Sequence, residues 1–317
     1  MRVLVLGHTG YLGGHVAGSP ALPPDTVLLR SGRSSGAELR VDLARVGVDA
    51  LAGILESAAP DAVINCAGAV GGDAVELAEV NARGPAVLCA ALRRAAPGAR
   101  LVHLGSAAEY GPGAEGVRVT ESAAARPVSP YGATKLAGTV AVASSGLDAV
   151  VLRVGNPVGP GAPSAGLPGR VAGLLRTAGR DPAAVLRLGD LSAYRDFVDV
   201  RDVARAAVLA ATVPGPLPGV LNIGGGRAVP VRELVASLVR AAGFRGRVEE
   251  AAHEGGSARS AGVSWQCSDS AAAGAALGWR PSYSLDDSAA ALWAARAGAG
   301  TARPKPLPAP SEGVRAP

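Results

Sequence analysis

The sequence is short of the residues that build metal centres and disulfide frameworks. Its three cysteines, Cys66, Cys89 and Cys267, lie far apart, and its four histidines are equally dispersed. Neither set has the short spacings of a zinc site, and an odd number of cysteines cannot all pair. We therefore expect no metal and no disulfide, as in a protein of the reducing cytoplasm.

Aromatic residues and lysines are also scarce. Aromatic residues make up 3% of the chain, and only Lys135 and Lys305 are lysines among 31 basic residues. The arginines are scattered, so there is no basic stripe and no stacking platform, and we expect no nucleic-acid partner. The net charge of +5 is more compatible with a substrate that carries phosphate groups.

Long hydrophobic runs are missing as well. The apolar start at 3–6 breaks at once into glycines, so we expect neither a signal peptide nor a membrane span there. The chain nevertheless has 317 residues, 48% of them hydrophobic, which is enough for one large domain and a smaller one.

The first motif is a glycine turn. Residues 2–6 have the apolar composition of a buried parallel strand. Gly7, Gly10 and Gly13 follow, and then a helix is expected to about residue 17. A strand, a glycine turn and a helix start together indicate a dinucleotide site, because the backbone can approach a pyrophosphate there. The alternative is a tight turn without a ligand.

The second strand, expected at 26–30, ends in a basic segment. A site that prefers NAD usually carries an acidic residue here, whereas this chain has Arg30, Ser31 and Arg33. These residues suit a 2′-phosphate and favour NADP(H), with NAD(H) possible, although a solvated basic loop would have the same composition. Asp42, in a short third strand expected at 41–43, could accept from the adenine amino group.

Strands and helices alternate through the first half of the chain. We expect helices at 44–58 and 76–96, the second broken at Gly84-Pro85, and strands at 61–66, 100–104 and 147–154. This alternation predicts an α/β fold, a Rossmann doubly wound parallel sheet with a smaller mixed α/β substrate domain. We expect a dinucleotide-binding domain at 1–155, a mainly substrate-binding domain at 156–298, in part returning to the sheet, and a disordered tail at 299–317.

The second motif is Ser129-Pro130-Tyr131-Gly132-Ala133-Thr134-Lys135. Ser129 is a good helix N-cap and Pro130 suits the first helical position, so Tyr131 and Lys135 lie one turn apart on one face. A nearby ammonium lowers the pKa of a phenol towards the range of efficient acid–base catalysis. A surface pair would show the same spacing. Ser106 follows the strand at 100–104 and is expected at the same sheet edge.

Together these motifs resemble the extended short-chain dehydrogenase/reductases, the NAD-dependent epimerase/dehydratase family, in the branch that modifies nucleotide sugars. The resemblance runs from about residue 1 to 293 and is most like dTDP-4-keto-deoxysugar reductases. It rests on segments in the family's order: 7–13, 65–68, Asn81, Ser106 with Tyr110-Gly111, Tyr131 with Lys135, 152–161, 195–203, 222–224 and 277–281.

The resemblance implies roles for individual residues. Tyr131 would be the general acid/base, Lys135 would bind the nicotinamide ribose and lower the phenol pKa, and Ser106 would bond the reacting oxygen. The substrate would contact Ser106, Glu109, Asn156, Arg195 and Arg259, the two arginines holding the diphosphate. The implied cofactor-binding residues are Gly7, Thr9, Gly10, Tyr11, Leu12, Gly13, Arg30, Ser31, Arg33, Asp42, Leu43, Cys66, Ala67, Gly68, Asn81, Tyr131, Lys135 and Val154.

The chain also departs from the family pattern. The sugar 4,6-dehydratases carry Asp-Glu after the Ser106 position, where this chain has Ala107 and Ala108, so dehydration is not expected. Glu109 stands where a small apolar residue is usual, and either solvation or contact with the sugar would account for it. Ala261-Gly262 replaces the usual Gly-Asp near Arg259, which argues against recognition of uridine and leaves Arg259 as either a phosphate ligand or a solvent-facing residue.

These observations predict an NADP(H)-dependent reductase that acts on a keto group, at C4, of a nucleotide-linked deoxysugar. The alternatives are a 4-epimerase with tightly held NAD, a reductase of a non-sugar carbonyl, and a non-catalytic dinucleotide-binding protein. The resemblance further implies a homodimer that pairs through the helices at about 83–96 and 130–145.

Overall fold

The computed structural model describes residues 1–34, 37–251 and 262–298. Within them, seven strands form one sheet in the order β10-β6-β5-β4-β1-β2-β3, and all neighbouring strands are parallel. The strands are β1 (Arg2–Leu6), β2 (Val27–Gly32), β3 (Leu39–Arg40), β4 (Ala62–Asn65), β5 (Arg100–Ser106), β6 (Ala149–Val154) and β10 (Val220–Ile223). The order reverses between β1 and β4, which is the arrangement of a Rossmann sheet.

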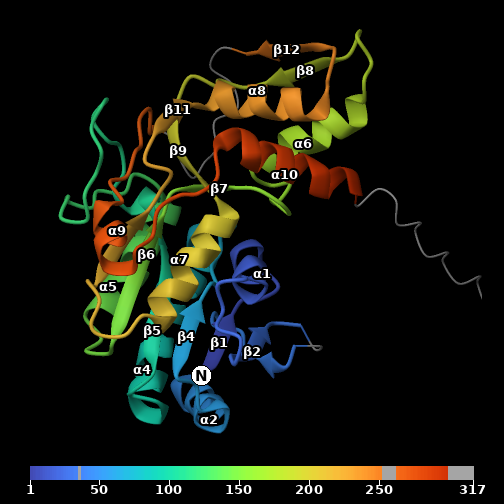
Figure 1. Cartoon of the computed structure of the whole chain (residues 1–317). Coiled ribbons are helices and arrows are strands. Elements are labelled where there is room, and N and C mark those ends of the chain that lie inside the picture. Colours follow the sequence, from blue (N-terminus) through green and yellow to red (C-terminus); the bar gives the residue numbers. More distant parts are fainter. Residues whose placement is uncertain (35–36, 252–261, 299–317) are drawn as a thin grey trace, which may run out of the picture.

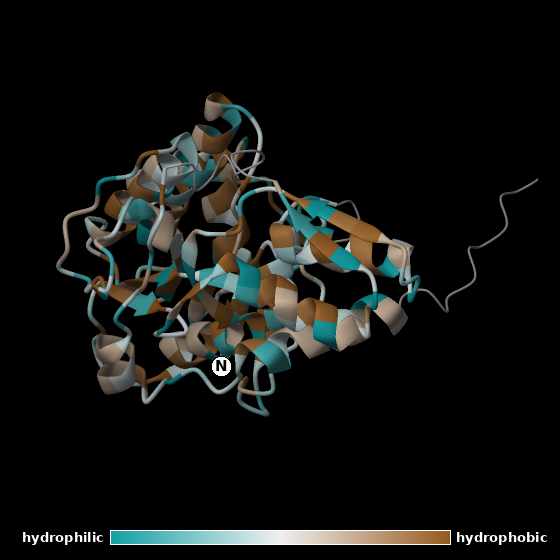
Figure 2. Ribbon diagram, turned by 90° about the horizontal axis from the view of Figure 1, so that it is seen from above, coloured by the Kyte–Doolittle hydropathy of each residue, from teal (hydrophilic) through white to brown (hydrophobic). Residues whose placement is uncertain are grey.

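Helices cover both faces of this sheet, and each face has its own hydrophobic core. One core packs the sheet against α1 (Tyr11–Ala17), α7 (Val200–Thr212) and α9 (Ala271–Leu277). The other packs it against α2 (Val48–Ala58), α4 (Gly84–Ala95) and α5 (Pro130–Ala143). Figure 1 shows α7 lying along the sheet next to α1. Brown and teal alternate along the helices in Figure 2, because each helix buries one face.

A smaller part of the molecule lies beyond one end of the sheet (Figure 1). It contains a sheet of β7 (Asn156–Val158), β9 (Tyr194–Asp199) and β11 (Ala228–Pro230), and a pair of β8 (Val185–Leu188) with β12 (Arg247–Glu250). A third core joins α6 (Leu167–Ala178), α8 (Val231–Ala242) and α10 (Leu285–Gly298). Since β7 follows β6 after a single residue, this part sits over the carboxyl ends of the parallel strands.

Most of the expected elements are present, with shifted ends. The strand at 2–6 is confirmed to the residue. The third strand is wrong: β3 lies at 39–40, while Val41 and Leu43 are buried in a loop. Their alternation with Asp42 imitates a strand, but the Asp42 carboxylate accepts from the Ala44 N–H and turns the chain. The tail at 299–317 lies outside the described residues.

The long helix expected at 76–96 is divided in an unexpected way. It consists of α3 (Ala74–Ala78), a π-helical turn η1 (Glu79–Arg83) and α4, which begins at Gly84. Pro85 has no N–H for the Asn81 carbonyl, and the Gly84 N–H bonds the Glu79 carbonyl five residues back. In the described part of the chain, no helix is long and apolar enough to cross a membrane.

Candidate active site

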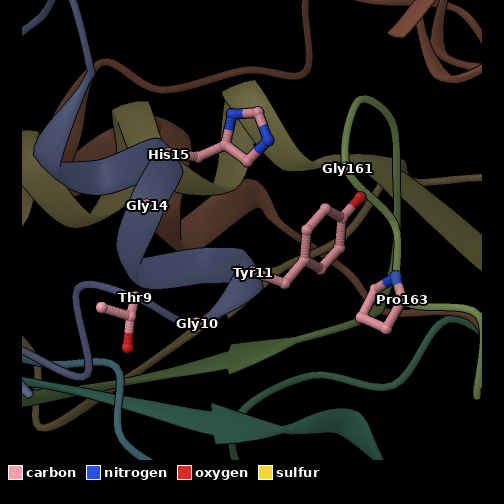
Figure 3. Close-up of a pocket in the computed structure, with 7 residues that line it drawn as sticks. All are labelled: Thr9, Gly10, Tyr11, Gly14, His15, Gly161 and Pro163. Carbon is pink, nitrogen blue, oxygen red and sulfur yellow. The ribbon is translucent and has the colours of Figure 1, made fainter. Parts of the chain in front are cut away.

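The glycine turn lies at the centre of the sheet, where the strand order reverses. It joins β1 to α1, and the first turn of α1 faces the loop after β7: the Tyr11 hydroxyl donates to the Gly159 carbonyl over 3.4 Å. A cavity of about 540 Å³ lies at this end of α1. Figure 3 shows the residues that line it: Thr9, Gly10, Tyr11, Gly14, His15, Gly161 and Pro163. In open parallel sheets, this crevice is where ligands bind.

The backbone of the glycine turn suits a dinucleotide. A Cβ on Gly13 would lie 2.1 Å from the Gly7 carbonyl oxygen, so only glycine lets α1 start this close to β1. No side chain caps the N-terminus of α1 at Gly10, which leaves its first N–H groups available. A pyrophosphate would satisfy these donors, with Tyr11 and Leu12 as the first helical residues.

The end of β2 lies against this turn. A Cβ on Gly32 would be 3.4 Å from the His8 ring and 3.6 Å from the Thr9 hydroxyl, so Arg33, the next residue, is close to the glycine turn and exposed. Ser31 is only 1% exposed and directs its carbonyl to the Gly7 and His8 N–H groups. Arg33 is thus better placed for a 2′-phosphate than Ser31.

The remaining candidates for the adenosine end are less exposed or lie further from the turn. Arg30 is exposed within β2, three residues before Arg33. The Asp42 carboxylate is half-buried and caps Ala44, and Leu43 is buried. Among them, Asp42 keeps enough exposure to meet a base.

The residues after β4 form the wall of the crevice opposite the end of β2. Cys66 and Ala67 are half-buried, and burial raises the pKa of the Cys66 thiol to about 12, so this thiol stays protonated. Asn81, on the π-helical turn, is 1% exposed. Its side chain accepts from the Ala69 N–H and donates to the Ala69 carbonyl, both over 2.9 Å. Asn81 therefore shapes the backbone beside Gly68 rather than presenting its amide to a ligand.

The start of α5, which carries Tyr131 and Lys135, packs on the end of β5, where Ser106 lies. The Ser129 hydroxyl accepts from the Gly132 N–H over 3.2 Å, and this cap, predicted from the sequence, starts α5 at Pro130. A Cβ on Gly132 would lie 2.5 Å from the Ala108 carbonyl oxygen, so the first turn of α5 touches the 3₁₀ turn η2 (Ala107–Glu109) that follows Ser106. Tyr131 is half-buried on this turn.

Lys135, one helical turn after Tyr131 on α5, is buried. Its ammonium donates to the Leu104 carbonyl on β5, and a Cβ on Gly68 would be 3.8 Å from Nζ. Burial lowers the pKa of Lys135, and the negative charge of Glu109 opposes that effect. The lysine thus connects the Gly68 wall to the strand that carries Ser106.

Glu109 corrects an expectation from the sequence. It is neither solvated nor open to a sugar, because it is 0% exposed. One carboxylate oxygen accepts from the Ser106 N–H over 2.7 Å, and the other from Arg153 Nε over 2.8 Å. The sequence could not show this, since Arg153 lies 44 residues away and the motif around it gave no sign of its partner.

Two further candidates line the side of the site that faces the smaller part. Asn156 donates to Gln266 Oε1 over 3.3 Å, and Gln266 in turn donates to the Ala107 carbonyl over 2.9 Å. Gln266 is 9% exposed and belongs to no motif, so the sequence did not point to it. It links the candidate substrate residue Asn156 to the turn after Ser106.

Arg195, on β9, is 7% exposed and donates to the Tyr194 carbonyl over 2.8 Å. It forms no ion pair among the residues that the structure describes, and burial lowers its pKa. An anionic ligand would compensate this buried charge. Val154, at the end of β6, is 3% exposed, and Arg259 lies outside the described residues.

A model of the NAD dependent epimerase/dehydratase family matches residues 3–224. The chain belongs to this family. The extended short-chain dehydrogenase/reductase resemblance and the Rossmann fold are thereby confirmed, and the chain is an NAD(P)-dependent enzyme of this family.

Individual family members are similar over nearly the whole chain. A dTDP-6-deoxy-L-talose 4-dehydrogenase (NAD(P)(+)) of Kitasatospora kifunensis is 36% identical, with 93% of this chain and 95% of that protein covered. The structure of RMD from Pseudomonas aeruginosa complexed with NADPH has a TM-score of 0.80 at 25% identity and covers 94% and 99% of the two chains. A UDP-glucose 4-epimerase of Thermus thermophilus in complex with NAD has a TM-score of 0.79 at 28% identity, covering 94% and 100%.

Proposed function

We propose that this protein is an NADP(H)-dependent reductase that converts a keto group, at C4, of a nucleotide-activated deoxysugar to a hydroxyl. The observation that carries the proposal is that the first turn of α5, which carries Tyr131, packs on the turn after Ser106, while Lys135 bonds the Leu104 carbonyl two residues before Ser106. Alanines stand at 107 and 108. Neither alanine can move a proton, so Tyr131 is the proton carrier of this site. The similarity to a dTDP-6-deoxy-L-talose 4-dehydrogenase supports the choice of C4, because a 4-dehydrogenase interconverts the same hydroxyl and ketone.

The cofactor would lie along the crevice, from Arg33 past the glycine turn to Lys135. Arg33 would pair with the 2′-phosphate, the N–H groups of Tyr11 and Leu12 would hold the pyrophosphate, and Lys135 would bond the nicotinamide ribose. Once bound, the nicotinamide supplies the hydride for the carbonyl carbon.

The protein's own residues would handle the proton. The Ser106 hydroxyl accepts from the Ala108 N–H over 3.2 Å, which orients the hydroxyl while leaving its proton for the substrate oxygen. Tyr131 would transfer its phenolic proton to this oxygen as negative charge develops there, so the ketone becomes a hydroxyl and Tyr131 a phenolate. The Lys135 ammonium would stabilise that phenolate until a proton returns from solvent.

The phosphates of the substrate would be held from the smaller part of the molecule. Arg195 is the buried cation on that side, and Asn156, tied to Ala107 through Gln266, would face the sugar. Arg259 is a further candidate for the diphosphate. A nucleotide sugar therefore matches the charge of this side better than a neutral ketone does.

The test is oxidation of NADPH or NADH in the presence of dTDP-4-keto-6-deoxyglucose. We expect consumption of NADPH in step with ketone, and a Tyr131→Phe variant whose turnover falls about 100-fold or more while it still binds NADPH. Tyr283→Phe is the matched control, because Tyr283 is exposed and lies under Arg201, outside the proposed site. Unchanged turnover in Tyr131→Phe contradicts the proposal.

A 4-epimerase is the second candidate, favoured by the likeness to the UDP-glucose 4-epimerase in complex with NAD. It would use the same three residues, with oxidation followed by re-reduction. Dinucleotide that stays bound through purification, together with sugar epimerisation and no net consumption of NAD(P)H, would identify this activity instead.

A further inference from the structure

Glu109 is a buried acid that the proposed reaction does not use. Its carboxylate bridges two groups, the Ser106 N–H at 2.7 Å and the Arg153 guanidinium at 2.8 Å. The side chains of this ion pair are 0% and 7% exposed, the least among the ion pairs of the described residues. Transfer of a carboxylate and a guanidinium from water into the protein interior costs free energy, so stability alone does not account for this pair.

Gly105, on β5, has no side chain, and the Glu109 carboxylate occupies the space that a side chain would need. A Cβ on Gly105 would lie 2.7 Å from Glu109 Oε1 and 2.8 Å from a Val151 methyl carbon. Any side chain at 105 would displace Glu109 from the Ser106 N–H. Gly105 therefore provides the space, Arg153 holds the Glu109 carboxylate, and Glu109 fixes the position of the Ser106 N–H.

The same short stretch of β5 also carries Lys135, whose ammonium bonds the Leu104 carbonyl. Only Gly105 separates the Leu104 carbonyl from the Ser106 N–H, so Lys135 and Glu109 bond neighbouring peptide groups of the same strand. Both side chains are buried, where water screens their attraction poorly.

Within the described part of the chain, the groups close to Lys135 other than Glu109 are neutral or positive. A further carboxylate, Glu121, accepts from the Asn222 N–H, and the Asn222 side chain accepts from the Tyr110 hydroxyl. Burial keeps the Cys66 thiol after β4 protonated, and burial and Lys135 lower the pKa of His103 on β5, so its imidazole stays neutral. Arg153, on β6, faces Glu109 and stacks 4.5 Å above the Tyr110 ring. Tyr131, on α5 itself, is the group whose proton Lys135 would assist. Glu109 is thus the negative charge that supports the ammonium.

We propose that Glu109 is a positioning residue of this site, fixing the Ser106 backbone from behind and supplying the negative charge that supports the Lys135 ammonium beside Tyr131. The contribution of Glu109 to catalysis rests on the proposed reductase function. The effect of the Glu109 charge on the Lys135 pKa is independent of that function and can be measured without a substrate.

The first experiment uses the scarcity of lysine. Because Lys135 and Lys305 are the only lysines in the sequence, ¹⁵N-lysine labelling of a Lys305→Arg protein leaves one side-chain signal. We expect the titration midpoint of Lys135 to fall by about one pH unit when Glu109→Gln is added. Asp202→Asn is the matched control, since Asp202 is a fully buried carboxylate paired with Arg205 on α7, and we expect it to leave the midpoint in place. An unmoved midpoint in Glu109→Gln overturns the proposal.

A double variant separates the charge from folding. Glu109→Leu with Arg153→Met replaces the pair by apolar side chains of similar size, which buried ion pairs often tolerate. It should also lower the Lys135 midpoint, by less than Glu109→Gln because the positive charge of Arg153 is lost as well, and it does not require that Glu109→Gln alone folds. A midpoint equal to that of the unaltered protein again overturns the proposal.

The second experiment measures kcat for keto-sugar reduction against pH. In Glu109→Gln we expect the decrease of kcat at high pH, the alkaline limb of the profile, to begin at a lower pH, as the Lys135 midpoint does. A purely structural role of Glu109 would instead lower kcat equally at every pH. A limb that stays in place overturns the positioning role. If the unaltered protein reduces no keto-sugar while the midpoint still moves, the proposed function fails and the charge relationship stands.

Discussion

The Lys135 ammonium donates a hydrogen bond to the Leu104 carbonyl, two residues before Ser106 on the same strand. This bond attaches α5 to the carboxyl end of β5, so the residues proposed for acid–base catalysis and for binding the oxygen are held by one piece of backbone. A helix and a strand that come from separate parts of the chain thereby form a single site.

Replacing Lys135 by Met should remove the cation beside Tyr131 while preserving most of the buried side-chain volume. The phenol pKa then rises and proton transfer becomes less effective, so we expect kcat to fall about 100-fold or more at pH 7. Steady-state reduction kinetics and NADPH binding measure the two effects separately. Lys305→Met is the matched control and should leave kcat unchanged. Equal turnover of the two variants would show that Lys135 has no part in catalysis.

Asn81→Ala tests the wall beside Gly68. The substitution deprives both the Ala69 N–H and the Ala69 carbonyl of partners, each now at 2.9 Å, which costs about 1–3 kcal/mol of stability. We expect a lower thermal midpoint and about tenfold weaker NADPH binding, measured by fluorescence titration. Thr134→Val removes the 3.3 Å contact with Asn81 and the 3.0 Å bond from the Thr134 hydroxyl to the Tyr131 carbonyl. It leaves both Ala69 partners in place and should weaken binding less. Cofactor affinity that survives Asn81→Ala would mean that this wall does not shape the dinucleotide site.

Arg33→Ala tests the choice of cofactor. Arg33 lies at the end of β2 next to the glycine turn, so its loss should weaken NADPH binding about tenfold or more and leave NADH binding nearly unchanged. Arg30→Ala is the matched control, because Arg30 lies three residues earlier in the strand. Parallel losses of NADPH and NADH affinity would argue against a 2′-phosphate site at Arg33.

Asp196 should make stability depend on pH. It is fully buried and accepts from the Gly226 and Ser268 N–H groups, and burial raises its pKa to about 6 from an ordinary 3.8. The folded protein therefore holds this proton more tightly than the unfolded chain. The free energy of unfolding should consequently decrease by about 3 kcal/mol as the pH rises from about 4 to about 6. Urea unfolding of the unaltered protein and of Asp196→Asn measures the difference, and parallel pH curves would contradict the expectation.

The sequence determined the parts of this protein that depend on near neighbours. The glycine turn after β1, the Ser129 cap with Pro130, and the spacing of Tyr131 and Lys135 are local patterns, because turns, caps and helix faces depend on residues a few positions apart. The alternation of strands and helices similarly predicted the parallel sheet, and with it the sheet edge near which Ser106 and the first turn of α5 lie.

Only the tertiary structure decided which distant groups become partners. Arg153 forms an ion pair with Glu109 across 44 residues, and Gln266 donates to the Ala107 carbonyl across 159. The sequence left Glu109 open between solvent and sugar, because its pattern of neighbours is the same whether or not an arginine from β6 is packed against it. A buried carboxylate has no water to solvate it, so its hydrogen-bond and ion-pair partners must come from the protein. For Glu109, the tertiary structure supplies these partners by packing β6 beside β5.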